Sequence, residues 1–342
     1  MTDRQTTRRA WIAAMAAMPA AAQTIDQEIR AFAGEAPLAM QFRGGTAEQC
    51  RQWQRAFAEQ LRMLLGPFDP PRRWEAVREQ KIDCGDHVRE ELLLKAEGRR
   101  DLPVHLLLPK QSGKRPGVLA LHGHGAFGHD AVAGIDSTPE RQADIAKLRY
   151  DYGRRLARRG YVVATPCFTP FGRRLGDRAS YRGEDPCGIT FVRMQLFGRV
   201  LMAENLHDAL WALDLLAAHE AVDGDRLGCV GLSLGGRMTM LTTALSPLIK
   251  VAVASGALNV MQERVRGRYS CGAQIIPGLL RYGDVPEIAS LIAPRPCLWE
   301  VGRQDPLMVK EWIDPSLERM RRAWSAYGAA DQLQADHFDG AH

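Results

Sequence analysis

The sequence predicts an α/β fold in which a mostly parallel sheet carries helices on both faces. After Pro116, short strands that are apolar throughout alternate with helical segments. Strands buried on both faces give such continuous apolar runs, and helices between them are typical of parallel connections. With 342 residues, 46% of them hydrophobic and 25% charged, the chain can form one large domain with an N-terminal extension.

The first 22 residues resemble a bacterial twin-arginine export signal. The pair Arg8–Arg9 precedes an alanine-dominated apolar stretch, and Ala20 and Ala22 suit cleavage before Gln23. We therefore expect an exported protein, periplasmic or extracellular, and the alternative is a cytoplasmic protein with a disordered or amphipathic tail. No apolar run reaches the roughly 20 residues that a membrane-spanning helix needs, so no membrane span is expected.

Residues 23–75 are interpreted as an N-terminal helical extension, and residues 76–342 as the α/β domain. Residues 23–45 are rich in loop-forming residues. Thr46 is a suitable N-cap for a helix over 46–65, where apolar residues recur at helical spacing. The runs within 81–96 and 102–109 are then expected to be antiparallel strands.

The α/β domain is expected to alternate strands and helices in a regular order. Strands are predicted at 117–123, 161–168, 226–233, 249–257, 294–302 and 331–338, and helices at 141–160, 202–219, 234–245 and 309–328. A polar, glycine-rich insert at 169–199 follows a strand at the end of the sheet where active sites collect. We expect it to contact substrate, with its arginines either meeting an acidic substrate or facing solvent.

The composition argues against several classes of partner. The net charge of +5 is modest, and there is neither a basic cluster interleaved with aromatic residues nor zinc-finger spacing, so no nucleic-acid partner is expected. The seven cysteines are scattered along the chain without a Cys-x-x-Cys motif, and this spacing does not indicate a disulfide framework. Export would allow a Cys167–Cys187 bridge across one loop, but this bridge is not predicted. No cofactor is predicted, and the sequence leaves the oligomeric state open.

A serine lies where a strand runs directly into a helix, in the stretch Gly231-Leu232-Ser233-Leu234-Gly235. In a nucleophile elbow the serine occupies a strained strand-to-helix turn, and small flanking residues let the backbones approach closely. Gly231 and Gly235 meet that need, so Ser233 is the predicted nucleophile. The alternative, a small residue in a glycine-rich loop, would not require glycine on both sides.

A serine nucleophile needs a histidine base and a carboxylate that orients it. Asp305 lies in the loop just past the strand at 294–302, and it is the predicted acid. Glu300, inside that strand, is the alternative acid. Only two histidines follow, and we expect His342, beyond the last strand, to be the base, with His337 as the alternative within the strand.

The loop after the strand at 117–123, which reads His-Gly-His-Gly from His122, is the predicted source of the oxyanion hole. Backbone N–H groups of Leu234 and His124 are expected to bind the oxyanion, with Gly125 as a substitute for His124. The two histidines of this loop are two residues apart, and no third histidine or carboxylate is clustered with them. No metal site is therefore predicted.

Together these motifs resemble the α/β-hydrolase superfamily, and more narrowly its dienelactone-hydrolase and acetyl-xylan-esterase-like group. The resemblance spans about residues 80–342 and rests on the segments LHGHG, VDGDRLGCVGLSLGG, IKVAVASGALN, PGLLRYGDVPEIASLIAPRPCLWEVGRQDP and FDGAH. It implies Ser233 as nucleophile, Asp305 as acid and His342 as base. Members normally continue past the catalytic histidine into a final helix, and this C-terminal helix is expected to be missing here.

The resemblance implies a serine hydrolase that cleaves a carboxylic ester, on a small molecule or on a carbohydrate, through an acyl-enzyme intermediate. Dienelactone hydrolases use cysteine at the elbow, so Ser233 favours an ordinary ester. Two alternatives are a serine peptidase of the prolyl-oligopeptidase type and a catalytically silent protein that has kept the fold.

Overall fold

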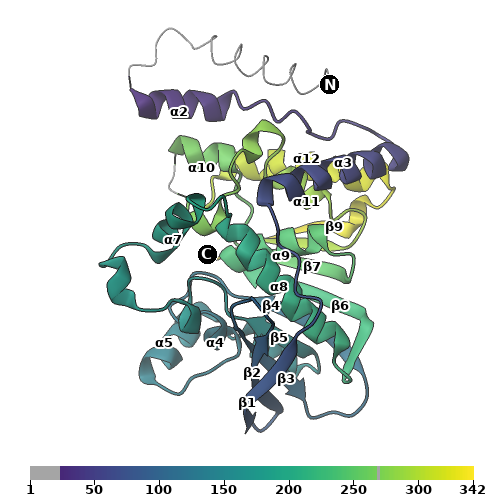
Figure 1. Ribbon diagram of the computed structural model, residues 1–342. Coiled ribbons are helices and arrows are strands. Elements are labelled where there is room, and N and C mark those ends of the chain that lie inside the picture. Colours follow the sequence, from purple (N-terminus) through teal and green to yellow (C-terminus); the bar gives the residue numbers. More distant parts are fainter. Residues whose placement is uncertain (1–23, 268–269) are drawn as a thin grey trace.

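The computed structural model describes residues 24–267 and 270–342 (Figure 1). The predicted export signal, residues 1–22, lies outside this part of the chain. Within it, no helix is both long enough and apolar enough to cross a membrane.

One nine-stranded sheet forms the centre of the molecule, in the order β1-β2-β3-β5-β4-β6-β7-β8-β9. The strands are β1 (Glu75–Asp83), β2 (His87–Lys95), β3 (Leu102–Pro109), β4 (Arg115–Leu121), β5 (Val162–Pro166), β6 (Val222–Leu232), β7 (Ile249–Ser255), β8 (Cys297–Gly302) and β9 (Leu333–Phe338). The pairings β1–β2, β2–β3 and β3–β5 are antiparallel, and the remaining five are parallel. The predicted mostly parallel sheet is confirmed.

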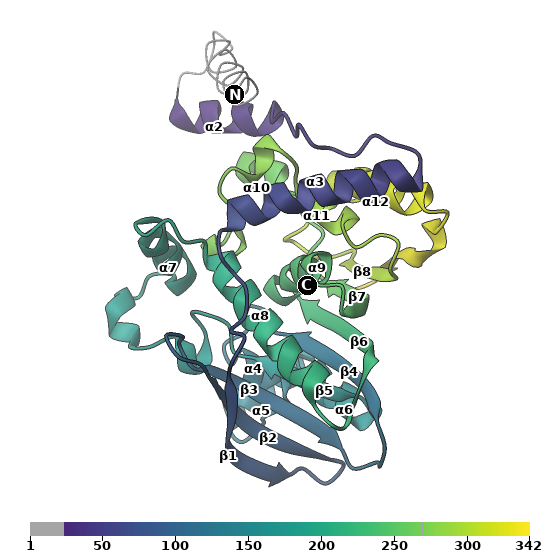
Figure 2. The ribbon, with the colours of Figure 1, turned by 45° about the vertical axis from the view of Figure 1, so that its right-hand side comes forward.

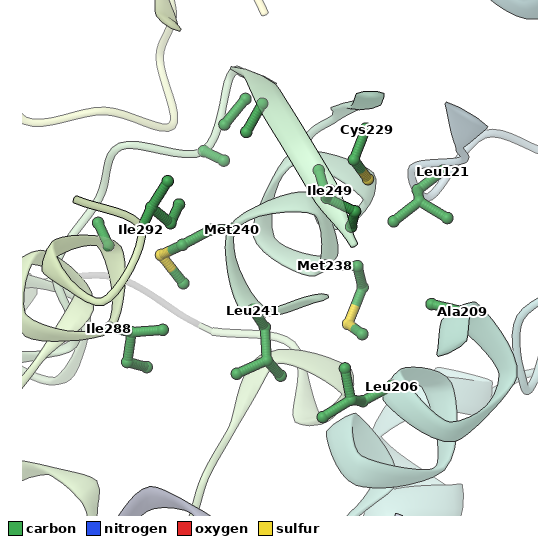
Figure 3. Close-up of a cluster of buried hydrophobic side chains, with 14 of the residues drawn as sticks. Leu121, Leu206, Ala209, Cys229, Met238, Met240, Leu241, Ile249, Ile288 and Ile292 are labelled. Carbon is green, nitrogen blue, oxygen red and sulfur yellow. The ribbon is translucent and has the colours of Figure 1, made fainter. Parts of the chain in front are cut away.

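Helices cover both faces of the sheet. Successive strand residues point to opposite sides, so strands that are apolar throughout present apolar side chains on both faces, and the helices bury them. Leu119 and Leu121 of β4 join the larger core, whereas Val118 and Ala120 join a smaller one. Helices on the larger core are α3 (Ala47–Leu65), α8 (Leu201–Ala218), α9 (Leu234–Leu245), α11 (Val285–Ser290) and α12 (Ile313–Ala326), and those on the smaller are α4 (His129–Val132) and α6 (Tyr152–Arg158). Figure 3 shows Met238 of α9 directed toward Leu206 of α8 in the larger core.

The N-terminal extension contains one helix that the sequence analysis missed. Residues 23–45 were expected to be loop-rich, but α2 (Ile25–Gly34) forms there, next to α10 (Met261–Gly267) (Figures 1 and 2). Thr24 caps it: its side chain accepts from the N–H of Gln27, and the Gln27 side chain accepts from the N–H of Thr24. This reciprocal capping box is a sequence signal that could have identified the helix.

The single helix predicted at 141–160 is wrong, because two helices occupy this range. They are α5 (Pro139–Leu148) and α6, and Arg149 between them has a φ of 53°. Asp151 begins the second helix, and its carboxylate accepts from the guanidinium groups of Arg154 and Arg155. A left-handed residue ends an α-helix, so the chain turns here despite the continuous helical pattern.

The face of the sheet that carries α6 is only partly covered over its later strands. Val251 of β7 is 42% exposed. Val230, Val253 and Leu298 lie in register across β6, β7 and β8 and are half-buried. Residues 339–342 follow β9 and form no helix.

A buried carboxylate holds the segment between β7 and α11 in place. Asp284 is fully buried, and it accepts from the backbone N–H groups of Met261, Gln262 and Val285 at 2.8, 3.0 and 2.7 Å. Burial raises its pKa. The neighbouring guanidinium of Arg237 is also buried, which lowers its pKa to about 9, and it donates to the backbone oxygen of Asn259 at 2.5 Å.

Replacing Asp284 by alanine is expected to lower the free energy of unfolding by about 3 kcal/mol, because three buried N–H groups lose their acceptor. Urea unfolding followed by circular dichroism measures the change. The control Asp225→Ala removes an exposed carboxylate and should change stability by less than about 0.5 kcal/mol. Equal losses in both variants would contradict this account of Asp284.

Candidate active site

Ser233 occupies the turn between β6 and α9, as predicted. Its backbone has a φ of 61° and a ψ of −118°. A residue other than glycine at such a positive φ costs on the order of 1–3 kcal/mol, and strain of this kind is concentrated at functional sites. The N–H of Ser233 donates to the carbonyl oxygen of Ser255 at the end of β7, 2.8 Å away, which fixes the turn to the neighbouring strand.

The glycines around Ser233 are required by close contacts between backbones. A β-carbon at Gly235 would lie 1.8 Å from the carbonyl oxygen of Leu121, at the end of β4. A β-carbon at Gly231 would lie 2.3 Å from the carbonyl oxygen of Gly235. Both distances are far below van der Waals contact, so larger residues would force apart the strand and helix that hold Ser233.

The loop after β4 lies directly against Ser233. A β-carbon at Gly123 would lie 3.3 Å from that of Ser233. Among the described residues, the N–H groups of Leu234, His124 and Gly125 donate no hydrogen bond. The N–H of Leu234 is free because it belongs to the first turn of α9, where intrahelical acceptors are lacking. These predicted oxyanion donors therefore remain available to a ligand.

His122, to which the sequence analysis gave no role, organises this loop. Its Nδ1 donates to the carbonyl oxygen of Gly123 at 2.8 Å, and its Nε2 accepts from the N–H of Phe168 at 2.9 Å. Burial lowers its pKa to about 4, so the ring is neutral at neutral pH. The hydroxyl of Tyr152 donates to the carbonyl oxygen of Leu121 at 2.5 Å. The sequence signal that could have identified the role of His122 is a histidine directly after an apolar strand.

Asp305 and His342 lie in contact, although 36 residues separate them in the chain. Nδ1 of His342 is 2.7 Å from Oδ2 of Asp305, whose side chain has no exposed surface. The other carboxylate oxygen of Asp305 accepts from the N–H of Leu307 at 2.8 Å. Asp305 is thus both a turn residue and the partner of a histidine.

The free nitrogen of His342 is directed into the protein. Its Nε2 is buried and has no hydrogen-bond partner among the described residues. The ring packs against Gly256, where a β-carbon would lie 3.0 Å from Cε1, and Gly256 directly follows Ser255, the backbone partner of Ser233. In two views the C-terminus lies beside α9, the helix that begins after Ser233 (Figures 1 and 2).

The alternative acid and base have different surroundings. Glu300 lies within β8, and its backbone oxygen accepts from the N–H of Gly256 at 3.0 Å. His337 lies within β9, paired in register with Val301. No hydrogen bond among the described residues joins either side chain to Asp305 or His342.

Two groups of side chains in the described structure could hold a metal ion. One consists of His105, His129 and Asp130, but Asp130 already pairs with His105 and with Arg141 at 2.8 and 2.9 Å. A carboxylate already paired with a guanidinium is a poor cation ligand.

The second group consists of His124, Cys187 and Cys271, close to the loop after β4. Nε2 of His124 lies 3.0 Å from the sulfur of Cys271. Hydrogen bonds from the Cys187 thiol and from His124 lower the pKa of Cys271 to about 5. All seven cysteines are free, so the Cys167–Cys187 bridge is absent, and Cys187 lies beside Cys271 instead.

Comparisons with known proteins agree with this architecture. No family model matches the chain. The protein called "Putative hydrolase YtaP" from Bacillus subtilis (strain 168) is 31% identical over 299 residues, which cover 83% of this chain and 93% of that protein.

Solved structures share the fold at lower identity. A protein described as a putative acetyl xylan esterase from Bacteroides fragilis has a TM-score of 0.77 at 17% identity, covering 92% of this chain and 82% of that one. A glucuronoyl esterase from Teredinibacter turnerae has a TM-score of 0.61 at 18% identity, covering 91% and 86%. The chain therefore belongs to the same family as the Bacillus subtilis hydrolase, and it has the α/β-hydrolase fold that its motifs predicted.

Proposed function

We propose that this protein is a serine hydrolase that cleaves carboxylic esters through an acyl-enzyme intermediate. The proposal rests on one arrangement: a strained Ser233 at the start of α9, together with His342 hydrogen-bonded to the buried Asp305. A nucleophile on a strained turn with a carboxylate-oriented histidine is the constellation that acyl transfer requires.

Each residue then has a defined role in the reaction. Oγ of Ser233 attacks the ester carbonyl while Nε2 of His342 takes its proton, and Asp305 holds the ring and stabilises the imidazolium. The N–H groups of Leu234 and His124, with Gly125 as the substitute, bind the oxyanion. His342 then protonates the leaving alcohol and later activates the water that releases the acid.

The expected substrates are esters of small molecules or of carbohydrates. The two structural neighbours are named for ester hydrolysis on xylan and on glucuronoyl groups. Three arginines of the insert pair with carboxylates of the fold: Arg173 with Glu79, Arg174 with Asp208, and Arg199 with Glu204. The charges of these three arginines are already paired, so these three are not free to meet an acidic substrate.

Replacing Ser233 by alanine is expected to lower kcat for a chromogenic short-chain acyl ester by about 10⁴-fold or more. The same variant should no longer be labelled by a serine-directed phosphonate, as measured by intact-protein mass spectrometry. Ser246→Ala, at the other end of α9, is the matched control and should retain labelling and turnover.

Three results would contradict the esterase. Faster turnover of a peptide than of the ester would indicate the peptidase, and an unlabelled wild-type protein would indicate the catalytically silent alternative. Labelling that persists in the Ser233→Ala variant would place the nucleophile elsewhere.

Replacing Asp305 by asparagine is expected to lower kcat by about 10⁴-fold, because the amide no longer holds the required tautomer of His342. Steady-state kinetics on the same ester measures the change. Glu300→Gln and His337→Gln are the matched controls, and each should change kcat only a few fold. A greater loss in either control than in Asp305→Asn would reassign the acid or the base.

We also propose that residues 1–22 direct export, which the arginine pair before an alanine-rich apolar stretch supports. Replacing both Arg8 and Arg9 by lysine should keep the protein in the cytoplasm of a bacterial host, as measured by cell fractionation. Arg4→Lys, outside the pair, is the control and should leave export unchanged. Export of the double variant would show that the signal is not of the twin-arginine type.

A further inference from the structure

Three segments that are distant in sequence bring two thiols and an imidazole together at one side of the candidate active site. His124 belongs to the loop after β4, Cys187 to the first turn of α7 (Pro186–Gln195), and Cys271 to the turn before residues 272–274. Their ligand atoms all lie within 4.8 Å of one another. His124 is exposed, Cys187 is buried and Cys271 is half-buried.

We propose that Nε2 of His124 and the sulfurs of Cys187 and Cys271 bind a thiophilic divalent cation, Zn²⁺, with the fourth position open to solvent. This inference goes beyond the proposed esterase and does not depend on it. A site with three protein ligands and one open position is a common form of zinc site.

The geometry fits zinc. Bonds of about 2.3 Å to sulfur and 2.0–2.1 Å to nitrogen in a tetrahedron place the ligand atoms about 3.5–3.8 Å apart. Nε2 of His124 is 3.0 Å from the sulfur of Cys271, and no pair in the cluster exceeds 4.8 Å. The exposed His124 ring can make the small adjustment that remains, and its exposure gives the ion a path of entry.

The ligand types select the metal. Two sulfurs and an imidazole nitrogen are soft to borderline ligands, which favour Zn²⁺ over Mg²⁺ or Ca²⁺. The carboxylate of Asp185, which caps α7 through the N–H groups of Cys187 and Gly188, adds negative charge near the ligands. The edge of the Phe171 ring packs against the His124 ring at 5.5 Å, which limits its orientations.

The ion would join the insert to the loop that carries the proposed oxyanion donors. Helix α7 continues beyond Cys187 to Gln195, and the two residues after it, Leu196 and Phe197, are apolar and 81% and 78% exposed. Phe191 of α7 packs closely on Gly272. A metal bond at Cys187 would fix the start of this helix against the active-site loop and the 271–274 turn.

Cobalt binding to the full-length chain tests the proposal. Reduced, chelator-treated protein is titrated with Co²⁺, and we expect one equivalent to produce a thiolate-to-cobalt charge-transfer band that Zn²⁺ then abolishes. Cys187→Ser and Cys271→Ser should each weaken binding at least 100-fold. Cys84→Ser, a half-buried thiol in the turn between β1 and β2, is the matched control and should bind as the wild type does.

A second measurement keeps the test valid if a serine variant fails to fold. In the wild-type protein, Zn²⁺ should protect Cys187 and Cys271 from alkylation, with the modified cysteines mapped by mass spectrometry. Ser233→Ala should bind cobalt like the wild type, so failure of the esterase and failure of the metal site can be distinguished.

Three results would overturn the proposal. The first is reduced protein that shows no charge-transfer band. The second is cobalt binding that survives in both serine variants, which would place the ion elsewhere. The third is a Cys187–Cys271 disulfide in the purified protein whose reduction restores no cobalt binding, which would make the pair a covalent link instead.

Discussion

The architecture of this hydrolase depends on the close approach of the β4 end to the first turn of α9. A β-carbon at Gly235 would lie 1.8 Å from the carbonyl oxygen of Leu121, so no other residue fits there without separating strand from helix. This contact holds the turn in which Ser233 has a positive φ, and Gly123 of the loop after β4 lies against the serine. The positions of the proposed nucleophile and of the proposed oxyanion site therefore both depend on one packing constraint.

Buried polar groups hold the loops that surround this contact. His122 links the loop after β4 to Phe168 at the end of β5, and it is neutral because burial lowers its pKa to about 4. Asp284 ties the segment after β7 to α11 through three backbone N–H groups, and Asp305 is enclosed between its own turn and His342. Each of these loops is held by a buried polar side chain. The residues proposed for the site, which follow β4, β6, β8 and β9, can therefore keep their positions although they lie in loops and turns.

Sequence patterns predicted most of the strands of the sheet. The predictions were wrong for helices whose ends depend on the conformation of single residues. The apolar runs of β4 and β5 were recognisable because both of their faces are buried, and those of β6 to β8 although one face is only partly covered. The break between α5 and α6 was not, since it depends on Arg149 adopting a left-handed conformation within an otherwise helical pattern. Helix α2 was missed although Thr24 and Gln27 form a capping box and apolar residues recur at helical spacing, because the glycines and the proline that follow it were read as signs of a loop.

The sequence by itself determined that Ser233 lies between two glycines at the end of a strand, and that Asp305 lies in the loop after a later strand. A strand followed at once by a turn is a local pattern, so it can be read from the order of residues along the chain. The sequence also narrowed the candidates for the proposed base to two histidines, His337 and His342. Only the tertiary structure decided that His342 meets Asp305, and that His124 lies beside Cys187 and Cys271. The two thiols near His124 cannot be recognised from the sequence, because they belong to segments 63 and 147 positions away along the chain. Contacts between such distant segments are set by how the sheet and its insert pack, which sequence spacing does not encode.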